Sequence, residues 1–175
     1  MNGNETGKET VDRAFAVEEV RKLAYQFADM YFVYVDELRQ RLGDDEAKKL
    51  ATGVLFRRAK ERALVMREDA DRLGLERVPD NIPKVSRVSY LGWVPSLGSD
   101  HCPYGAAWKK RIRDNEWFRE YAALYCDVTD TTIAEVFTGK YSHRLIRNVV
   151  LGHEVCERIY FESEKTARGE YTYGE

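Results

Sequence analysis

A cysteine and two aspartates stand close together in one short segment of the C-terminal half of the sequence. This segment reads Tyr-Cys-Asp-Val-Thr-Asp and spans residues 125–130. A cysteine becomes a nucleophile only as a thiolate, so a neighbouring cation, a general base or a helix N-terminus must lower its pKa from about 8.5. An aspartate at the start of a helix is stabilised as an anion and can orient a water molecule. Cys126 and Asp130 are therefore the first candidates for catalytic residues.

The same segment also has a purely structural interpretation. Cys126 can be a buried residue that behaves as a small apolar side chain. Asp127, Thr129 and Asp130 can be capping residues, which are common where one helix ends and the next begins. The residue types alone leave both interpretations open.

Two further cysteines are candidates for the same site. His101 and Cys102 come directly before Pro103, which is well suited to the first position of a helix because its missing N–H is not needed there. The dipole of that helix favours a thiolate at Cys102, although a simple turn pair is an equal alternative. Cys156 lies on the same face of a predicted strand as Arg158, which makes it a third candidate.

A metal site on these residues is an alternative to a thiol site. Thiolate and imidazole are ligands that zinc and iron accept, so Cys102, Cys126 and Cys156 could hold such an ion together with His101 or His153. No pair has the close CxxC spacing that makes this prediction specific. We therefore predict no cofactor. The sequence also lacks the common phosphate-binding, dinucleotide-binding, zinc-protease and serine-hydrolase motifs.

Composition narrows the class of protein. The chain has 33% charged and 43% hydrophobic residues, with 28 Lys and Arg against 30 Asp and Glu, as in an ordinary globular protein. A balanced charge without a basic patch argues against a nucleic-acid partner. The sequence has neither a secretory signal nor a run long and apolar enough to span a membrane. Because three widely spaced cysteines are typical of reduced thiols, we expect a cytoplasmic protein that binds a small-molecule substrate.

Two long helices are expected to open the fold. Apolar residues three and four apart over residues 17–42 predict a helix whose buried stripe includes Leu23, Tyr34 and Leu42. Gly43 ends this helix, and Asp44 is the predicted N-cap of a second helix that ends before Gly74. The short link predicts an antiparallel pair. Its apolar stripes either face the core or form a surface for a homo-oligomer.

Shorter elements are expected in the remainder of the chain. We predict a strand at 85–94, helices at 103–112, 116–125 and 130–137, and a hairpin of strands at 142–150 and 155–162. In the last strand, Ile159 and Phe161 should point into the core, while Cys156, Arg158 and Tyr160 face solvent or a cavity. The expected fold is α+β, with an N-terminal helical hairpin and further helices packed on a small antiparallel sheet. One domain at 15–163 should lie between a flexible tail at 1–14 and a polar, mobile tail at 164–175.

Three segments of the C-terminal half match a known pattern in order and spacing. They are Cys-Pro-Tyr at 102–104 with Trp108 one turn later, the segment at 125–130, and Gly-His-Glu-Val-Cys at 152–156. On these residues the chain resembles the L-2-amino-thiazoline-4-carboxylic acid hydrolase-like family over about residues 85–161. His153 departs from the pattern, which has an acidic residue after the glycine.

The resemblance implies a hydrolase that opens a cyclic amidine-like C–N bond in a small sulfur-containing amino acid. It implies catalytic roles for Cys126, Asp130 and Cys156. The substrate-binding residues that we predict are His101, Cys102, Trp108, Asp127, His153 and Arg158. In this hypothesis the Cys126 thiolate or a water held by Asp130 attacks the carbon, and Arg158 holds the substrate carboxylate.

Two other classes of function remain as alternatives. The chain can be a non-catalytic small-molecule or metal-binding sensor domain that uses the same pocket. It can also be an interaction protein built on the helical pair.

Overall fold

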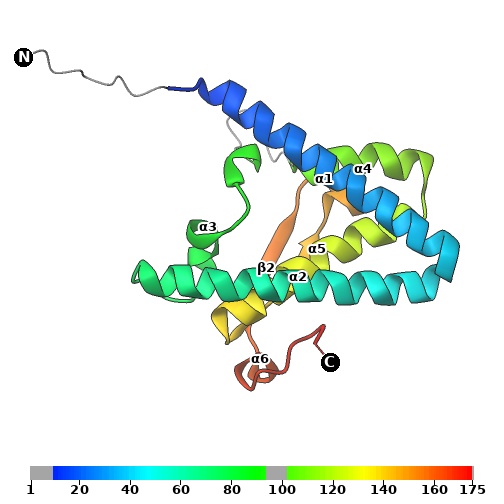
Figure 1. Ribbon diagram of the computed structural model, residues 1–175. Helices are drawn as coiled ribbons and strands as arrows, with labels where there is room; N and C mark the ends of the chain where they lie inside the picture. The colour runs from blue at the N-terminus through cyan, green and yellow to red at the C-terminus, as the bar shows by residue number, and fades with distance from the viewer. Residues whose placement is uncertain (1–9, 94–101, 175) are drawn as a thin grey trace, which may run out of the picture.

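The computed structural model describes residues 10–93 and 102–174 and is mostly helical (Figure 1). Two long helices, α1 (Arg13–Leu42) and α2 (Asp44–Arg72), come first. The next elements are η1 (Pro79–Asn81), α3 (Ile82–Val85), η2 (Tyr90–Trp93), α4 (Pro103–Asp114) and α5 (Phe118–Thr138). The chain then forms β1 (Tyr141–Arg147), η4 (Val149–Leu151), β2 (Glu157–Glu162) and α6 (Glu164–Ala167). None of the described helices is long and apolar enough to cross a membrane.

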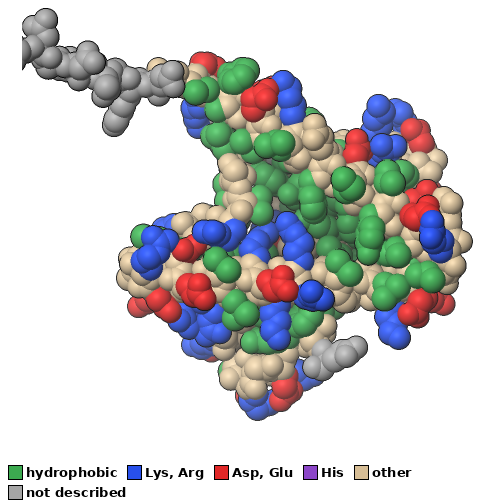
Figure 2. All heavy atoms as spheres, viewed as in Figure 1, with side chains coloured by type: hydrophobic (Ala, Val, Ile, Leu, Met, Phe, Trp, Pro, Cys, Tyr) green, Lys and Arg blue, Asp and Glu red, His purple; other side chains and the backbone are tan. Residues whose placement is uncertain are grey.

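The N-terminal helical pair is confirmed, but its buried stripe differs from the predicted one. α1 begins after Asp12, whose side chain accepts a hydrogen bond from the backbone N–H of Phe15, and it ends at Gly43, which has a φ of 81°. The buried residues of α1 are Val17, Arg21, Ala24, Ala28, Tyr31, Phe32 and Val35. Leu23, Tyr34 and Leu42 are exposed, so hydrophobic side chains reach the surface along this face (Figure 2).

The second helix packs closely on α5 because its inner face carries small side chains. Alanines stand at 47, 51, 59, 63 and 70 on this face, with Leu55 and Met66 completing the line. α2 contacts α5 over most of its length. Asp44 is the first residue of α2 and its N-cap is Gly43, so the prediction of Asp44 as the cap is wrong by one residue.

Aromatic side chains join α1, α4 and α5 into one core. Trp108 is fully buried, and its Nε1–H donates to the carbonyl of Ala28 at 3.0 Å. The hydroxyl of Tyr31 donates to the carbonyl of Tyr121 at 3.0 Å. The rings of Tyr31, Trp108 and Tyr125 contact one another. Trp108 is therefore part of the core and has no exposed surface.

The predicted strand at 85–94 is wrong in its described part, residues 85–93. There α3 ends at Val85 and η2 covers Tyr90–Trp93. Arg21 donates from Nε to the carbonyl of Gly92 at 3.0 Å, which fixes this backbone against α1. A Cβ at Gly92 would lie 3.1 Å from Val20, so glycine permits the approach. This segment therefore packs on a helix instead of joining a sheet.

One continuous helix replaces the two predicted around Cys126. α5 runs from Phe118 to Thr138 and ends at Gly139, whose φ of 67° confirms the predicted stop. Neither glycine nor proline interrupts this range. Asp127 and Asp130 lie in the middle of the helix, so they do not cap helix ends. Their side chains instead contact Tyr173 and Arg158.

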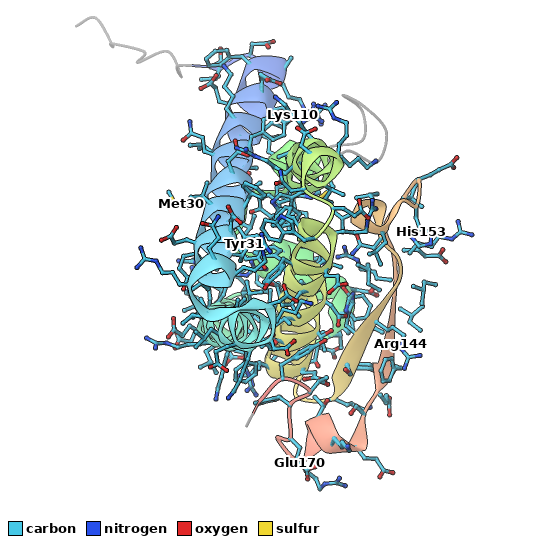
Figure 3. All side chains as sticks on the ribbon, turned by 90° about the vertical axis from the view of Figure 1, so that its right-hand side faces the viewer. Met30, Tyr31, Lys110, Arg144, His153 and Glu170 are labelled. Atoms are coloured by element: carbon cyan, nitrogen blue, oxygen red, sulfur yellow. The ribbon has the colours of Figure 1, made fainter. Side chains whose placement is uncertain are left out.

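The predicted antiparallel hairpin and the α+β fold class are confirmed. β1 pairs with β2, and His143 lies opposite Tyr160. Figure 3 shows three layers from left to right: α1 and α2, then α4 and α5, then the hairpin. The prediction that Ile159 and Phe161 point into the core is wrong, because these side chains are 43% and 39% exposed. A two-stranded sheet covers α5 with only one face, and Cys156, Arg158 and Tyr160 occupy that face.

The C-terminal segment is bound to the helices, in contrast to the mobile tail that we expected. The carboxylate of Glu135 is buried and accepts hydrogen bonds from Ser142 and from both the backbone N–H and the hydroxyl of Thr172. Tyr173 donates to Asp127. A buried carboxylate that loses a donor destabilises the fold, so these contacts hold residues 171–174 in place.

The Glu135–Thr172 contact gives a first prediction. Thr172→Val removes one donor to a buried carboxylate, and we expect it to lower the free energy of unfolding by about 1–3 kcal/mol. Thr166→Val is the matched control, because the Thr166 hydroxyl is buried without a hydrogen-bond partner among the described residues. Chemical denaturation should find Thr166→Val neutral or stabilising. Equal stabilities of the two variants would contradict the role given to Glu135.

Candidate functional site

One cavity of about 200 Å³ brings together the three cysteines, Asp130 and Arg158. Cys102 comes from the N-cap of α4, Cys126 and Asp130 from α5, and Cys156 and Arg158 from the strand side. Cys126 and Asp130 are four residues apart on one helix and therefore share a face. On the face in Figure 2 the surface is hollowed between α1, α2 and the segment that carries α3 and η2. Two wider grooves among the described residues contain no cysteine.

Three of the predicted site residues are described and do not line the cavity. Trp108 lies in the core, and the Asp127 carboxylate faces Tyr173 and a separate surface groove. His153 is exposed on the hairpin loop, where its Nδ1 accepts from the backbone N–H of Asn148 at 3.1 Å (Figure 3). His153 therefore stabilises the loop through its own hydrogen bond to Asn148. His101 lies outside the described residues.

Aromatic residues form much of the cavity wall, and the sequence analysis did not identify them as site residues. Tyr90 and Trp93 come from η2, while Tyr104 and Tyr125 come from α4 and α5. Tyr125 belongs to a motif that we singled out, but only for its cysteine and aspartates. The positions of Tyr90 and Trp93 depend on the contact between Gly92 and α1, which no local pattern predicts.

Arg62 of α2 is another cavity residue that the sequence analysis missed. Its helical neighbours Ala59, Ala63 and Met66 are buried, so a charged residue here stands at the edge of the core-facing stripe. A charged residue next to the buried stripe of a helix can be recognised from the sequence once the stripe has been assigned. Long charged side chains usually extend from such a position to water, whereas Arg62 lines the cavity.

Asp130 and Arg158 form the charged pair of the cavity. Arg158 Nη2 lies 3.5 Å from Asp130 Oδ2, and both side chains are only partly exposed. The guanidinium orients the carboxylate while leaving its second oxygen available to water or a ligand. The predicted role of Arg158 as holder of a substrate carboxylate thus competes with its pairing to Asp130.

Burial disfavours the thiolate form of two of the cavity cysteines, Cys102 and Cys126. Burial raises the pKa of Cys126 well above its ordinary value, and the negative charge of Asp130 raises it further. Burial also raises the pKa of Cys102, although the backbone N–H of Gly105 donates to its sulfur at 3.3 Å. A thiol needs a lowered pKa to act as a nucleophile at neutral pH. The electrostatics of the cavity therefore favour a water held by Asp130 over attack by a Cys126 thiolate.

The metal alternative finds no support in residues 10–93 and 102–174. These residues contain no group of three or more His, Cys, Asp and Glu side chains placed to hold an ion. The three cysteines are free and partly buried. They share a cavity without forming a ligand set.

Comparison with protein-family models, curated proteins and solved structures finds no match for this chain. The function is therefore argued from the cavity itself.

The raised thiol pKa values predict slow alkylation. At pH 7, Cys102 and Cys126 should react with iodoacetamide at least about tenfold more slowly in the folded protein than in urea, because few molecules carry a thiolate. Their rates should still be rising above pH 9. Peptide mapping by mass spectrometry measures each site separately, and rapid labelling of Cys126 at neutral pH would restore the thiolate mechanism.

Proposed function

We propose that this chain is a hydrolase that opens a cyclic amidine-like C–N bond in a small molecule. The observation that carries the proposal is the convergence of Cys102, Cys126, Asp130 and Cys156, which are far apart in the sequence, on one shielded cavity. A volume of about 200 Å³ suits a single small ring. The resemblance adds the substrate class, a sulfur-containing cyclic amino acid.

Asp130 is the general base in this proposal. It accepts a proton from water as the water oxygen bonds to the amidine carbon, and it passes that proton to the ring nitrogen, so that the C=N bond becomes a single bond. The new hydroxyl then gives its proton through Asp130 to the same nitrogen as the C–N bond breaks and the product carbonyl forms. Arg158 pairs with Asp130 and fixes the direction of its carboxylate. Cys126, as a neutral thiol, donates a weak hydrogen bond, and Cys156 shapes the wall around the reacting carbon.

The alternative is a non-catalytic small-molecule-binding domain. The protonated Cys102 and Cys126 favour it, because a cavity that keeps its thiols neutral also suits a site that binds without reacting. Turnover separates the two functions directly.

Asp130→Asn tests the general base. Against a panel of cyclic amidines that includes 2-amino-thiazoline-4-carboxylate, the unmodified protein should yield a product heavier by one water. Asp130→Asn should lower this rate by at least about 100-fold, while Cys126→Ser retains most of it.

Asp114→Asn is the matched control, because Asp114 is exposed at the end of α4, outside the cavity. Circular dichroism checks that each variant is folded. Full activity in Asp130→Asn would refute the proposed base, and loss of activity only in Cys126→Ser would assign the chemistry to the thiol. Binding without any hydrolysis would favour the alternative.

A further inference from the structure

Arg62 lines the cavity and has no hydrogen-bond or ion-pair partner within residues 10–93 and 102–174. Its Nε is shielded from solvent and has no hydrogen-bond partner, and no ion pair to its guanidinium is found among the described residues. The neighbouring Arg58 on the next turn lies over the ring of Phe27, at 5.2 Å from the ring centre. Buried polar groups in proteins are nearly always hydrogen-bonded, so an unsatisfied guanidinium nitrogen calls for a functional explanation.

The charges of the cavity do not balance. Asp130 is the one carboxylate on the described wall, and Arg158 already pairs with it at 3.5 Å. Arg62 therefore leaves a surplus positive charge. Lys and Arg side chains stand in the hollow beside α2 in Figure 2. Burial lowers the pKa of Arg62, as expected for a cation that is held away from water without a bound anion.

A second unsatisfied atom and the aromatic wall indicate the shape of the missing partner. Thr129 also lines the cavity, and its buried hydroxyl has no hydrogen-bond partner in the described part of the chain. The rings of Trp93 and Tyr104 contact each other at 5.3 Å between centres. Aromatic walls favour a flat ring, whereas a guanidinium and a hydroxyl favour an oxyanion.

We propose that Arg62 binds the negative group of a small, flat monoanion, such as a ring carboxylate, whose ring lies against the aromatic wall. The inference rests on the proposed function for the cavity and extends it by naming the residue that selects an anionic ligand. Arg62 is thus a specificity residue, distinct from the Asp130–Arg158 pair that acts on the reacting bond.

The test compares anions with neutral molecules of the same shape. Benzoate and pyrrole-2-carboxylate should raise the melting temperature and bind in calorimetry, whereas benzamide and pyrrole-2-carboxamide should not. Arg62→Met should weaken binding of the carboxylates about 10- to 100-fold, and Arg62→Lys should weaken it less. Arg57→Gln is the control, because Arg57 is exposed on the same helix and pairs with Glu61.

The stability of the ligand-free protein separates binding from a structural role. If Arg62 serves a ligand, Arg62→Met removes an unpaired buried charge and leaves the melting temperature unchanged or higher. If Arg62 supports the fold, the same variant melts at a lower temperature, and the proposal is overturned. Equal binding of carboxylates and carboxamides, or carboxylate binding that survives in Arg62→Met, also overturns it.

These measurements do not depend on catalysis. Asp130→Asn should keep the carboxylate binding, because Arg62 and the aromatic wall are unchanged. Hydrolysis of neutral cyclic amidines without carboxylate binding would remove the role of Arg62 and leave the proposed hydrolase intact. Carboxylate binding without hydrolysis would support the role of Arg62 and count against the proposed hydrolase.

Discussion

The close contact between α2 and α5 is the constraint on which the rest of the structure depends. Alanines along α2 let the two helix backbones approach, and this places Arg62 of one helix and Asp130 of the other on the wall of the same cavity. Larger side chains at Ala59 or Ala63 would separate the helices. The depth of the cavity and the shielding of its charges thus follow from the small size of residues that have no chemistry of their own.

Shielding also determines what the cavity residues can do. The burial that keeps Cys126 protonated is the burial that strengthens the interaction between Asp130 and Arg158. A more open cavity would release the thiol to react and would weaken the charged pair. The site is therefore better suited to acid–base chemistry, or to binding, than to covalent catalysis by cysteine.

The sequence predicted the helices and strands better than the contacts between residues far apart in the chain. Helical periodicity identified α1 and α2, and Gly43 and Gly139 correctly marked two helix ends, because these signals are local. The segment at 85–93 contains strand-forming residues, but its backbone binds to Arg21 of α1, a contact between residues 71 apart. Cys126 and Asp130 converged with Cys102 and Cys156 as the proposed site required, whereas Trp108 and His153 were assigned by motif position and have structural roles.

The binding of Thr172 and Tyr173 to α5 has a consequence for the order of folding. Glu135 obtains two of its three donated hydrogen bonds from a residue 37 positions later. Until that residue has docked, the carboxylate stays hydrated and the packing around it stays incomplete. Final consolidation of the layer that carries Cys126 and Asp130 therefore requires a contact with a segment that is distant along the chain.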